Sequence, residues 1–171
     1  QAFAFGQSLL SQLRGSQAGA IRHISYLSKV QLLLADCLVT SNNVHPAQAI
    51  LHFQDGASTL ISDLILVNSM VSDNHGTAIH FEQSANRANF KLLNSLLAFN
   101  GPSQEDAAPF RSGYGLRFES FADSLLQLQL LNSIIWGNEK ADVLLQPEDL
   151  SRMIVDSRHN IYGYFENDPN V

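Results

Sequence analysis

Histidine, arginine and glutamate recur in this sequence at spacings that suit a binding surface. The set comprises His23, His52, His80 and Arg117, with Gln54, Glu82 and Glu119 each two residues after one of the last three. Imidazole, guanidinium, amide and carboxylate groups hydrogen-bond hydroxyls, pair with charged ligands and, in suitable surroundings, transfer protons. We expect these side chains to form an outward polar face that binds a glycan or another protein.

Catalysis by the same residues would require a tuned acid and base. His80 with Glu82, and Arg117 with Glu119, are the candidate pairs, because a neighbouring charge shifts a pKa. No nucleophile or leaving-group partner can be named beside them, so simple ion pairs along a strand are the favoured interpretation. A polysaccharide lyase or glycoside hydrolase therefore stays an alternative to a non-catalytic binding module, and a structural spacer is a third.

Metal binding has a weaker basis in the sequence. His52, His80 and Glu82 offer suitable ligand types, but neither their spacing nor a second shell is specific. We assign no metal and no cofactor.

The amino-acid composition indicates a folded protein and limits the classes of partner that it can bind. Apolar residues make up 45% of the 171 residues and charged ones 15%, which favours a folded chain with a substantial core. The net charge of -6 argues against nucleic acid, whose binding depends on clustered Lys and Arg. No apolar run has the roughly 20 residues of a membrane helix. The single cysteine, Cys37, has no partner for an internal disulfide.

The elements that position these side chains come from an internal repeat. Asn-Ser pairs at Asn68, Asn94 and Asn132 align with one another, and Asp36 occupies the same place in an earlier copy. A second asparagine follows each of these sites after six residues, at Asn42, Asn74, Asn100 and Asn138. A repeat of this length predicts a solenoid whose coils hold three short strands with insertions at the corners.

Apolar residues alternate with polar ones in each copy, which indicates strands. The inward pairs that precede the asparagines are Leu32 and Leu34, Leu64 and Leu66, Phe90 and Leu92, and Leu128 and Leu130. In the third strand of each copy we align Ile24, Phe53, Phe81, Phe118 and Leu145 as one inward column, and Arg22 breaks the pattern of inward residues in the first copy. The polar face described above then alternates with this core column.

The corner asparagines are expected to form a structural ladder. Asparagine tolerates left-handed backbone angles and bonds neighbouring amides, so Asn68, Asn94 and Asn132 should point inward and bond the backbone of adjacent coils. Asn74, Asn100 and Asn138 should form the second turn. A leucine-rich repeat is the main rival fold, but its asparagine lies three residues after the last strand leucine, whereas Leu66 and Asn68 are two apart.

The C-terminal part of the sequence resembles a known family. Asn132-Ser-Ile-Ile-Trp-Gly-Asn138, Ala141-Asp142-Val143, Asn160-Ile161-Tyr162-Gly163 and Asn167-Asp168-Pro169 are similar to the closing coils of bacterial pectate-lyase-like β-helix proteins, particularly surface proteins with a variable C-terminal anchor. The resemblance covers roughly residues 30 to 171. It implies an all-β, right-handed, single-stranded parallel β-helix with three strands per coil.

The resemblance also implies a location and a ligand class. It places the chain at the bacterial surface or outside the cell, as one β-helix domain over residues 1–171 that is a fragment of a longer protein, with a polysaccharide or surface protein as partner. Enzymes of that family cleave acidic polysaccharides with calcium-binding carboxylates and an arginine base, or with paired aspartates. The chain has no Asp-Asp pair and no adjacent Arg-Lys, and Arg117 alone does not make a lyase centre.

A long insertion and the single tryptophan are weaker candidates for a binding role. The longest insertion, Gly101 to Gly113, should project from a corner and is either a binding loop or a tolerated insertion. Trp136 is expected to be a partly buried corner aromatic, with sugar stacking as the alternative.

Overall fold

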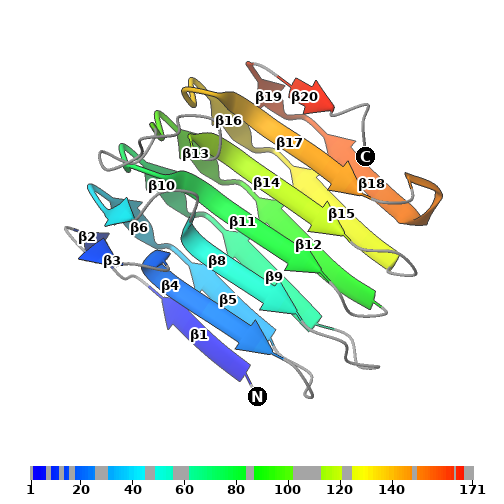
Figure 1. The fold of residues 1–171 in the computed structure, drawn as a ribbon, viewed down its shortest axis with the longest axis horizontal. Coiled ribbons are helices and arrows are strands. Elements are labelled where there is room, and N and C mark those ends of the chain that lie inside the picture. The colour runs from blue at the N-terminus through cyan, green and yellow to red at the C-terminus, as the bar shows by residue number, and fades with distance from the viewer. Residues whose placement is uncertain are drawn as a thin grey trace.

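The computed structural model describes residues 2–6, 9–11, 14–15, 18–25, 31–44, 49–55, 62–83, 87–101, 113–120, 125–147, 150–163 and 165–167. These residues form strands β1 to β20 and one short 3-10 helix, η1 (Leu150–Arg152). Figure 1 shows the strands stacked as successive coils from the blue N-terminal end to the red C-terminal end. The architecture is an all-β parallel β-helix, as the repeat predicts.

Three parallel sheets run along the stack, and each coil contributes one strand to each sheet. Sheet I contains β1 (Ala2–Gly6), β5 (Gln31–Ala35), β9 (Ser62–Val67), β12 (Arg87–Leu93), β15 (Leu125–Leu131) and β18 (Met153–Arg158). Sheet II contains β2 (Leu9–Ser11), β6 (Leu38–Thr40), β10 (Met70–Ser72), β13 (Leu96–Ala98), β16 (Ile134–Trp136) and β19 (Ile161–Tyr162). Sheet III contains β4 (Ala18–Ser25), β8 (Ala49–Asp55), β11 (Thr77–Gln83), β14 (Tyr114–Ser120), β17 (Ala141–Pro147) and β20 (Phe165–Asn167), while β3 (Arg14–Gly15) pairs with β7 (Asn43–Val44).

A stack of phenylalanines in sheet III confirms the inward column. Phe53, Phe81 and Phe118 lie in register on adjacent strands and are at most 1% exposed. The ring centroids of Phe53 and Phe81 are 4.9 Å apart, and the ring planes are nearly parallel, at 9° to each other. The Phe81 and Phe118 rings are 5.4 Å apart. Strand alternation therefore directs these rings into the core and the intervening polar residues outward.

The first coil departs from the predicted alignment. Ile24 lies beside Gln54 rather than Phe53, so it does not extend the phenylalanine column in register. The cause is an irregularity between Ala18 and Ile21, where β4 shifts relative to β8. One extra residue in a strand moves every following side chain by one place.

A buried asparagine ladder joins successive coils where sheet II ends. Asn42 Nδ2 donates to Asn74 Oδ1 at 3.0 Å, and Asn74 Nδ2 donates to Asn100 Oδ1 at 2.9 Å. Asn100 Nδ2 then donates to Asn138 Oδ1 at 2.8 Å. The side-chain amides of Asn74, Asn100 and Asn138 also donate to backbone carbonyls, as in the 3.1 Å bond from Asn100 Nδ2 to the Val71 carbonyl. The second-turn asparagines are thus confirmed as ladder residues.

The asparagines of the first corner were expected to point inward, and this was wrong. Asn68, Asn94 and Asn132 are exposed, and each has a positive φ of 49 to 50°. Their side chains bond one another along the outside, with Asn132 Nδ2 donating to Asn94 Oδ1 at 3.1 Å. The left-handed backbone of the turn directs the asparagine side chain to solvent, and the residue after it occupies the interior.

The serines that follow these asparagines bond the backbone of adjacent coils, as was expected of the asparagines. Ser69 N donates to Ser95 Oγ at 3.1 Å, and Ser95 N donates to Ser133 Oγ at 3.2 Å. All three serines are at most 5% exposed. The corner consequently has two stacked rows, an exposed row of asparagines and a buried row of serines.

Candidate functional site

The predicted polar face lies on the outer side of sheet III. His52, His80 and Arg117 are in register on β8, β11 and β14. A second row, two residues later, contains Gln54, Glu82, Glu119 and Gln146. Six of the seven predicted ligand-binding residues are therefore brought together.

His23 is the seventh, and its backbone is not in the histidine row. It lies beside Phe53, and Arg22 takes the place beside His52. Arg22, which was expected only to interrupt the core pattern, is exposed. The side chain of His23 lies outside the described part of the chain.

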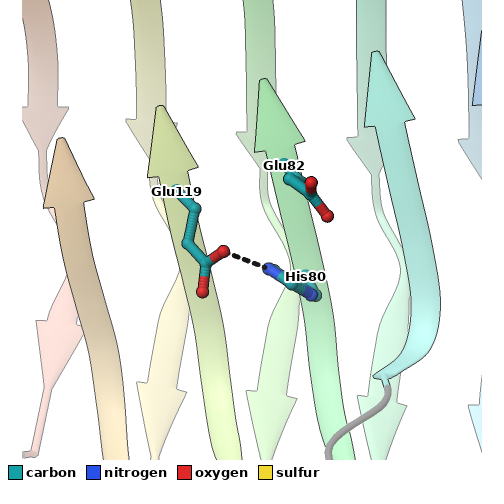
Figure 2. Close-up of side chains that lie close together, drawn as sticks. All are labelled: His80, Glu82 and Glu119. Carbon is teal, nitrogen blue, oxygen red and sulfur yellow. Dashed lines mark ion pairs between the residues drawn. The ribbon is translucent and has the colours of Figure 1, made fainter. Parts of the chain in front are cut away.

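The two histidines are more buried than an outward strand face suggests. His52 is 6% exposed and His80 is 7% exposed, and their ring centroids are 5.0 Å apart. His52 Nε2 lies 3.8 Å from Glu82 Oε2, and His80 Nε2 lies 3.6 Å from Glu119 Oε2. Each histidine thus faces the glutamate of the following coil, and Figure 2 shows this arrangement for His80 and Glu119.

These contacts lower the pKa values of the carboxyl groups. The pKa of Glu119 falls to about 2, chiefly through its interaction with His80 and further through the charge of Arg117. The pKa of Glu82 is lowered, mainly by its interaction with His52. Burial lowers the pKa of His80 and outweighs the opposing effect of Glu119. At neutral pH the site therefore contains two ionised carboxylates and a neutral His80.

The pairing within this face differs from the pairs considered for catalysis. His80 and Glu82 were paired along one strand, but His80 Nε2 has its 3.6 Å contact with Glu119 on the next strand. Arg117 does form an ion pair with Glu119, as expected. Neither carboxyl has the raised pKa that a general acid needs at neutral pH.

A second polar surface, which the sequence analysis missed, forms a pocket on the outer side of sheet I. Its volume is about 270 Å³, and its lining comes from β12, β15 and β18. The outward side chains that line it are Asn89, Lys91, Gln127, Gln129, Ile154 and Asp156. The polar residues that alternate with buried apolar residues in β12 and β15 were the available signal.

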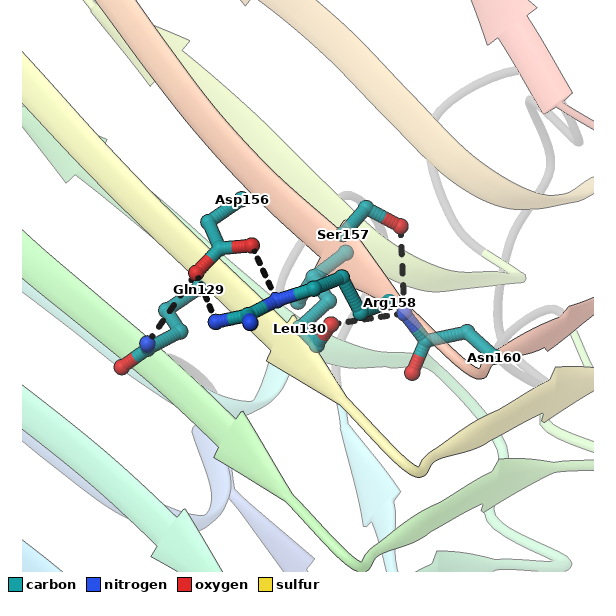
Figure 3. Close-up of polar contacts among 6 residues, drawn as sticks. All are labelled: Gln129, Leu130, Asp156, Ser157, Arg158 and Asn160. Atoms are coloured by element: carbon teal, nitrogen blue, oxygen red, sulfur yellow. Dashed lines mark hydrogen bonds and ion pairs between the residues drawn. The ribbon is translucent and has the colours of Figure 1, made fainter.

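Hydrogen bonds organise the C-terminal side of this pocket (Figure 3). Arg158 pairs with Asp156 at 2.8 Å, and Gln129 Nε2 donates to Asp156 Oδ2 at 3.3 Å. Asn160 Nδ2 donates to the Leu130 carbonyl at 2.7 Å and thereby ties the end of β18 to β15. The Arg158 guanidinium holds the pKa of Asp156 below its ordinary value.

The remaining candidates have less support. Trp136 is 50% exposed at the end of β16, so it is more open than the expected partly buried aromatic. Residues 102–112 of the long insertion lie outside the described residues. Among the residues that the structure describes, no helix is long and apolar enough to span a membrane.

Fold and site together define the class of protein, a parallel β-solenoid with polar outer strand faces. No family model, curated protein or solved structure matches the chain significantly.

Proposed function

We propose that this protein is a non-catalytic β-helix module that binds glycans through an outer polar strand face, and that the pocket on sheet I is the binding site. The pocket itself carries the proposal, because it combines a hollow with a regular array of polar side chains. Asn89, Gln127 and Ile154 form one row across three coils. Lys91, Gln129 and Asp156 form the parallel row.

The chemistry of this array suits a sugar. Glutamine amides donate and accept hydrogen bonds, as sugar hydroxyls do. Asn89 Oδ1 is buried and has no hydrogen-bond partner among the described residues, so it offers an acceptor to a bound hydroxyl. Ile154 is 51% exposed and supplies an apolar surface for the C–H face of a ring. A mainly apolar lining with a few placed polar groups would suit other small molecules better.

The sheet III face is the second candidate for the same function. Its Arg117 and histidines suit an acidic glycan or an acidic protein surface, and Arg22 adds an exposed positive charge beside His52. The carboxylates of this face already engage Arg117 and the histidines, however, and His52 and His80 are almost fully buried. The sheet III face therefore presents fewer accessible polar groups to a ligand than the pocket does.

Location and evolutionary relationship are part of this proposal. The resemblance to bacterial pectate-lyase-like surface proteins supports a secreted or surface-attached protein that meets polysaccharide outside the cell. The parallel β-helix is consistent with that relationship, although one fold hosts many functions. A polysaccharide lyase or hydrolase and a structural spacer remain the alternatives.

Glycan binding to two matched double variants tests the proposal. Binding to neutral and acidic polysaccharides is first screened, and the affinity for the best ligand is measured by calorimetry. Gln127→Ala with Gln129→Ala should weaken binding about tenfold or more, because at least one hydrogen bond to the ligand is lost. Gln54→Ala with Gln146→Ala, at outward positions of sheet III, should leave the affinity nearly unchanged.

Each alternative has its own outcome. An affinity lowered only by the sheet III double variant would move the site to that sheet. Release of oligosaccharides from the polymer would identify an enzyme. An absence of binding to every polysaccharide would overturn glycan recognition and leave the spacer.

A further inference from the structure

Three side chains of types that can ligate a metal ion meet on the outer face of sheet III. His80 and Glu82 come from β11, and Glu119 comes from β14. One ligand atom from each residue lies within 4.8 Å of the others. Figure 2 shows the two carboxylates on neighbouring strands with the His80 ring close to both.

The distance between His80 and Glu119 is informative. His80 Nε2 and Glu119 Oε2 are 3.6 Å apart, which is longer than an ordinary hydrogen bond. Two ligand atoms that each lie about 2.1 Å from one tetrahedral ion are roughly 3.4 Å apart. The pair is therefore spaced more like two ligands of one ion than like a hydrogen-bonded donor and acceptor.

His80 provides a second, independent observation. Its side chain is only 9% exposed, and Nε2 has no hydrogen-bond partner in the part of the chain that the structure describes. A buried imidazole nitrogen without a hydrogen bond is costly unless something else satisfies it. Nε2 points toward the carboxylates, where a cation would satisfy both.

Neighbouring side chains hold the two carboxylates in place. Arg117 pairs with Glu119 through Oε1, which leaves Oε2 facing His80. Gln54 Nε2 donates to Glu82 Oε1 at 3.0 Å. Outer contacts of this kind orient metal ligands and reduce the entropy lost on binding. The Arg117 charge opposes a cation, so the affinity should be moderate.

From this arrangement we infer that His80, Glu82 and Glu119 bind a divalent transition-metal ion, with Zn²⁺ as the best match. Ca²⁺ and Mg²⁺ prefer sites made of oxygen ligands, whereas imidazole favours Zn²⁺ and its neighbours in the series. Three protein ligands leave a fourth position for water or a ligand group. The metal site considered from the sequence contained His52, His80 and Glu82, and in the structure Glu119 takes the place of His52. This site is separate from the sheet I pocket.

Zinc titration of the chelator-treated protein tests the inference. Calorimetry should show one saturable Zn²⁺ site per chain, and saturating Zn²⁺ should raise the melting temperature, because an ion that binds only the folded state stabilises it. Glu82→Gln and Glu119→Gln should each weaken binding about tenfold or more, since the amide loses the carboxylate charge. Co²⁺ in the same site should give the visible absorption of a low-symmetry N/O site.

Matched controls separate this site from adventitious binding. Glu139→Gln and His159→Asn change an exposed glutamate and an exposed histidine outside the cluster and should leave the affinity unchanged. His80→Gln should also weaken binding, because it removes the imidazole ligand. Circular dichroism verifies that each variant is folded, and if His80→Gln does not fold, the two glutamate variants decide. An absence of saturable binding, retention of wild-type affinity in both glutamate variants, or a preference for Ca²⁺ or Mg²⁺ over Zn²⁺ would overturn the inference.

Discussion

Asn138 Nδ2 donates a 2.7 Å hydrogen bond to Asp142 Oδ1, and the Asn138 backbone N–H donates to the same oxygen at 3.0 Å. Asp142 is 2% exposed, so the last asparagine of the buried ladder, Asn138, bonds a buried carboxylate. Every amide in the ladder donates toward that end, from Asn42 through Asn138. Asp142 thus accepts the same pair of donors, a backbone N–H and an Nδ2, that Asn138 Oδ1 accepts from Asn100.

Removal of this acceptor should destabilise the fold. Asp142→Ala leaves two donors of Asn138 without their partner, and we expect a loss of about 1–3 kcal/mol in the free energy of unfolding. Asp142→Asn keeps an oxygen at this position and should cost less. Urea denaturation of both variants measures the losses, and an unchanged stability of Asp142→Ala would show that the ladder does not depend on this acceptor.

Truncation of the central phenylalanine should be costlier. Phe81 is 0% exposed and contacts the rings of Phe53, Phe90 and Phe118, so Phe81→Ala should lower the free energy of unfolding by about 3–5 kcal/mol through lost burial and a residual cavity. Ile134→Ala, at a position that is 40% exposed on sheet II, is the matched control and should cost much less. A loss below about 1 kcal/mol for Phe81→Ala would contradict the packing of this column.

Substitution of asparagine by glycine should affect stability much more in the buried asparagine row than in the exposed row. Asn94→Gly removes an exposed side chain at a φ of 49°, where glycine is favoured, so stability should change little. Asn100→Gly deletes a buried amide that bonds Asn138 and the Val71 and Ala98 carbonyls. We expect a loss of at least about 2 kcal/mol, since several buried groups lose a partner. Thermal unfolding should rank the variants in this order, and the reverse order would assign the structural role to the exposed row.

Glycan binding should show little dependence on pH above about 4. Arg158 lowers the pKa of Asp156, and a lowered pKa means that the carboxylate stays charged to lower pH than an ordinary aspartate, whose pKa is about 3.9. Arg158→Ala should return the pKa toward that value, so affinity should begin to fall as the pH approaches about 4. Calorimetry at several pH values compares this variant with Arg152→Ala, a change at an exposed arginine of η1. Identical pH profiles for all three proteins would remove Asp156 from the binding site.

The repeat and its period-two alternation were sufficient to predict the parallel β-helix, because both are local properties of the chain. The phenylalanine column followed from the same alternation and is confirmed by the register of Phe53, Phe81 and Phe118. The second-turn asparagines were also correctly predicted as a ladder. In the first coil, however, a single irregularity in β4 moved His23 and Ile24 out of their expected rows.

Tertiary structure decided what the repeat could not. Sequence spacing suggested inward asparagines at the first corner, but the left-handed turn places Asn94 outside and Ser95 inside. The sequence also paired His80 with Glu82 on its own strand, whereas the stacking of coils brings Glu119 from 39 residues away to within 3.6 Å of His80 (119−80). Alternation along a strand determines which face a side chain occupies, and this is encoded locally. The identity of its neighbours on that face depends on the lengths of the insertions and on the register between coils, which form only when the chain has folded.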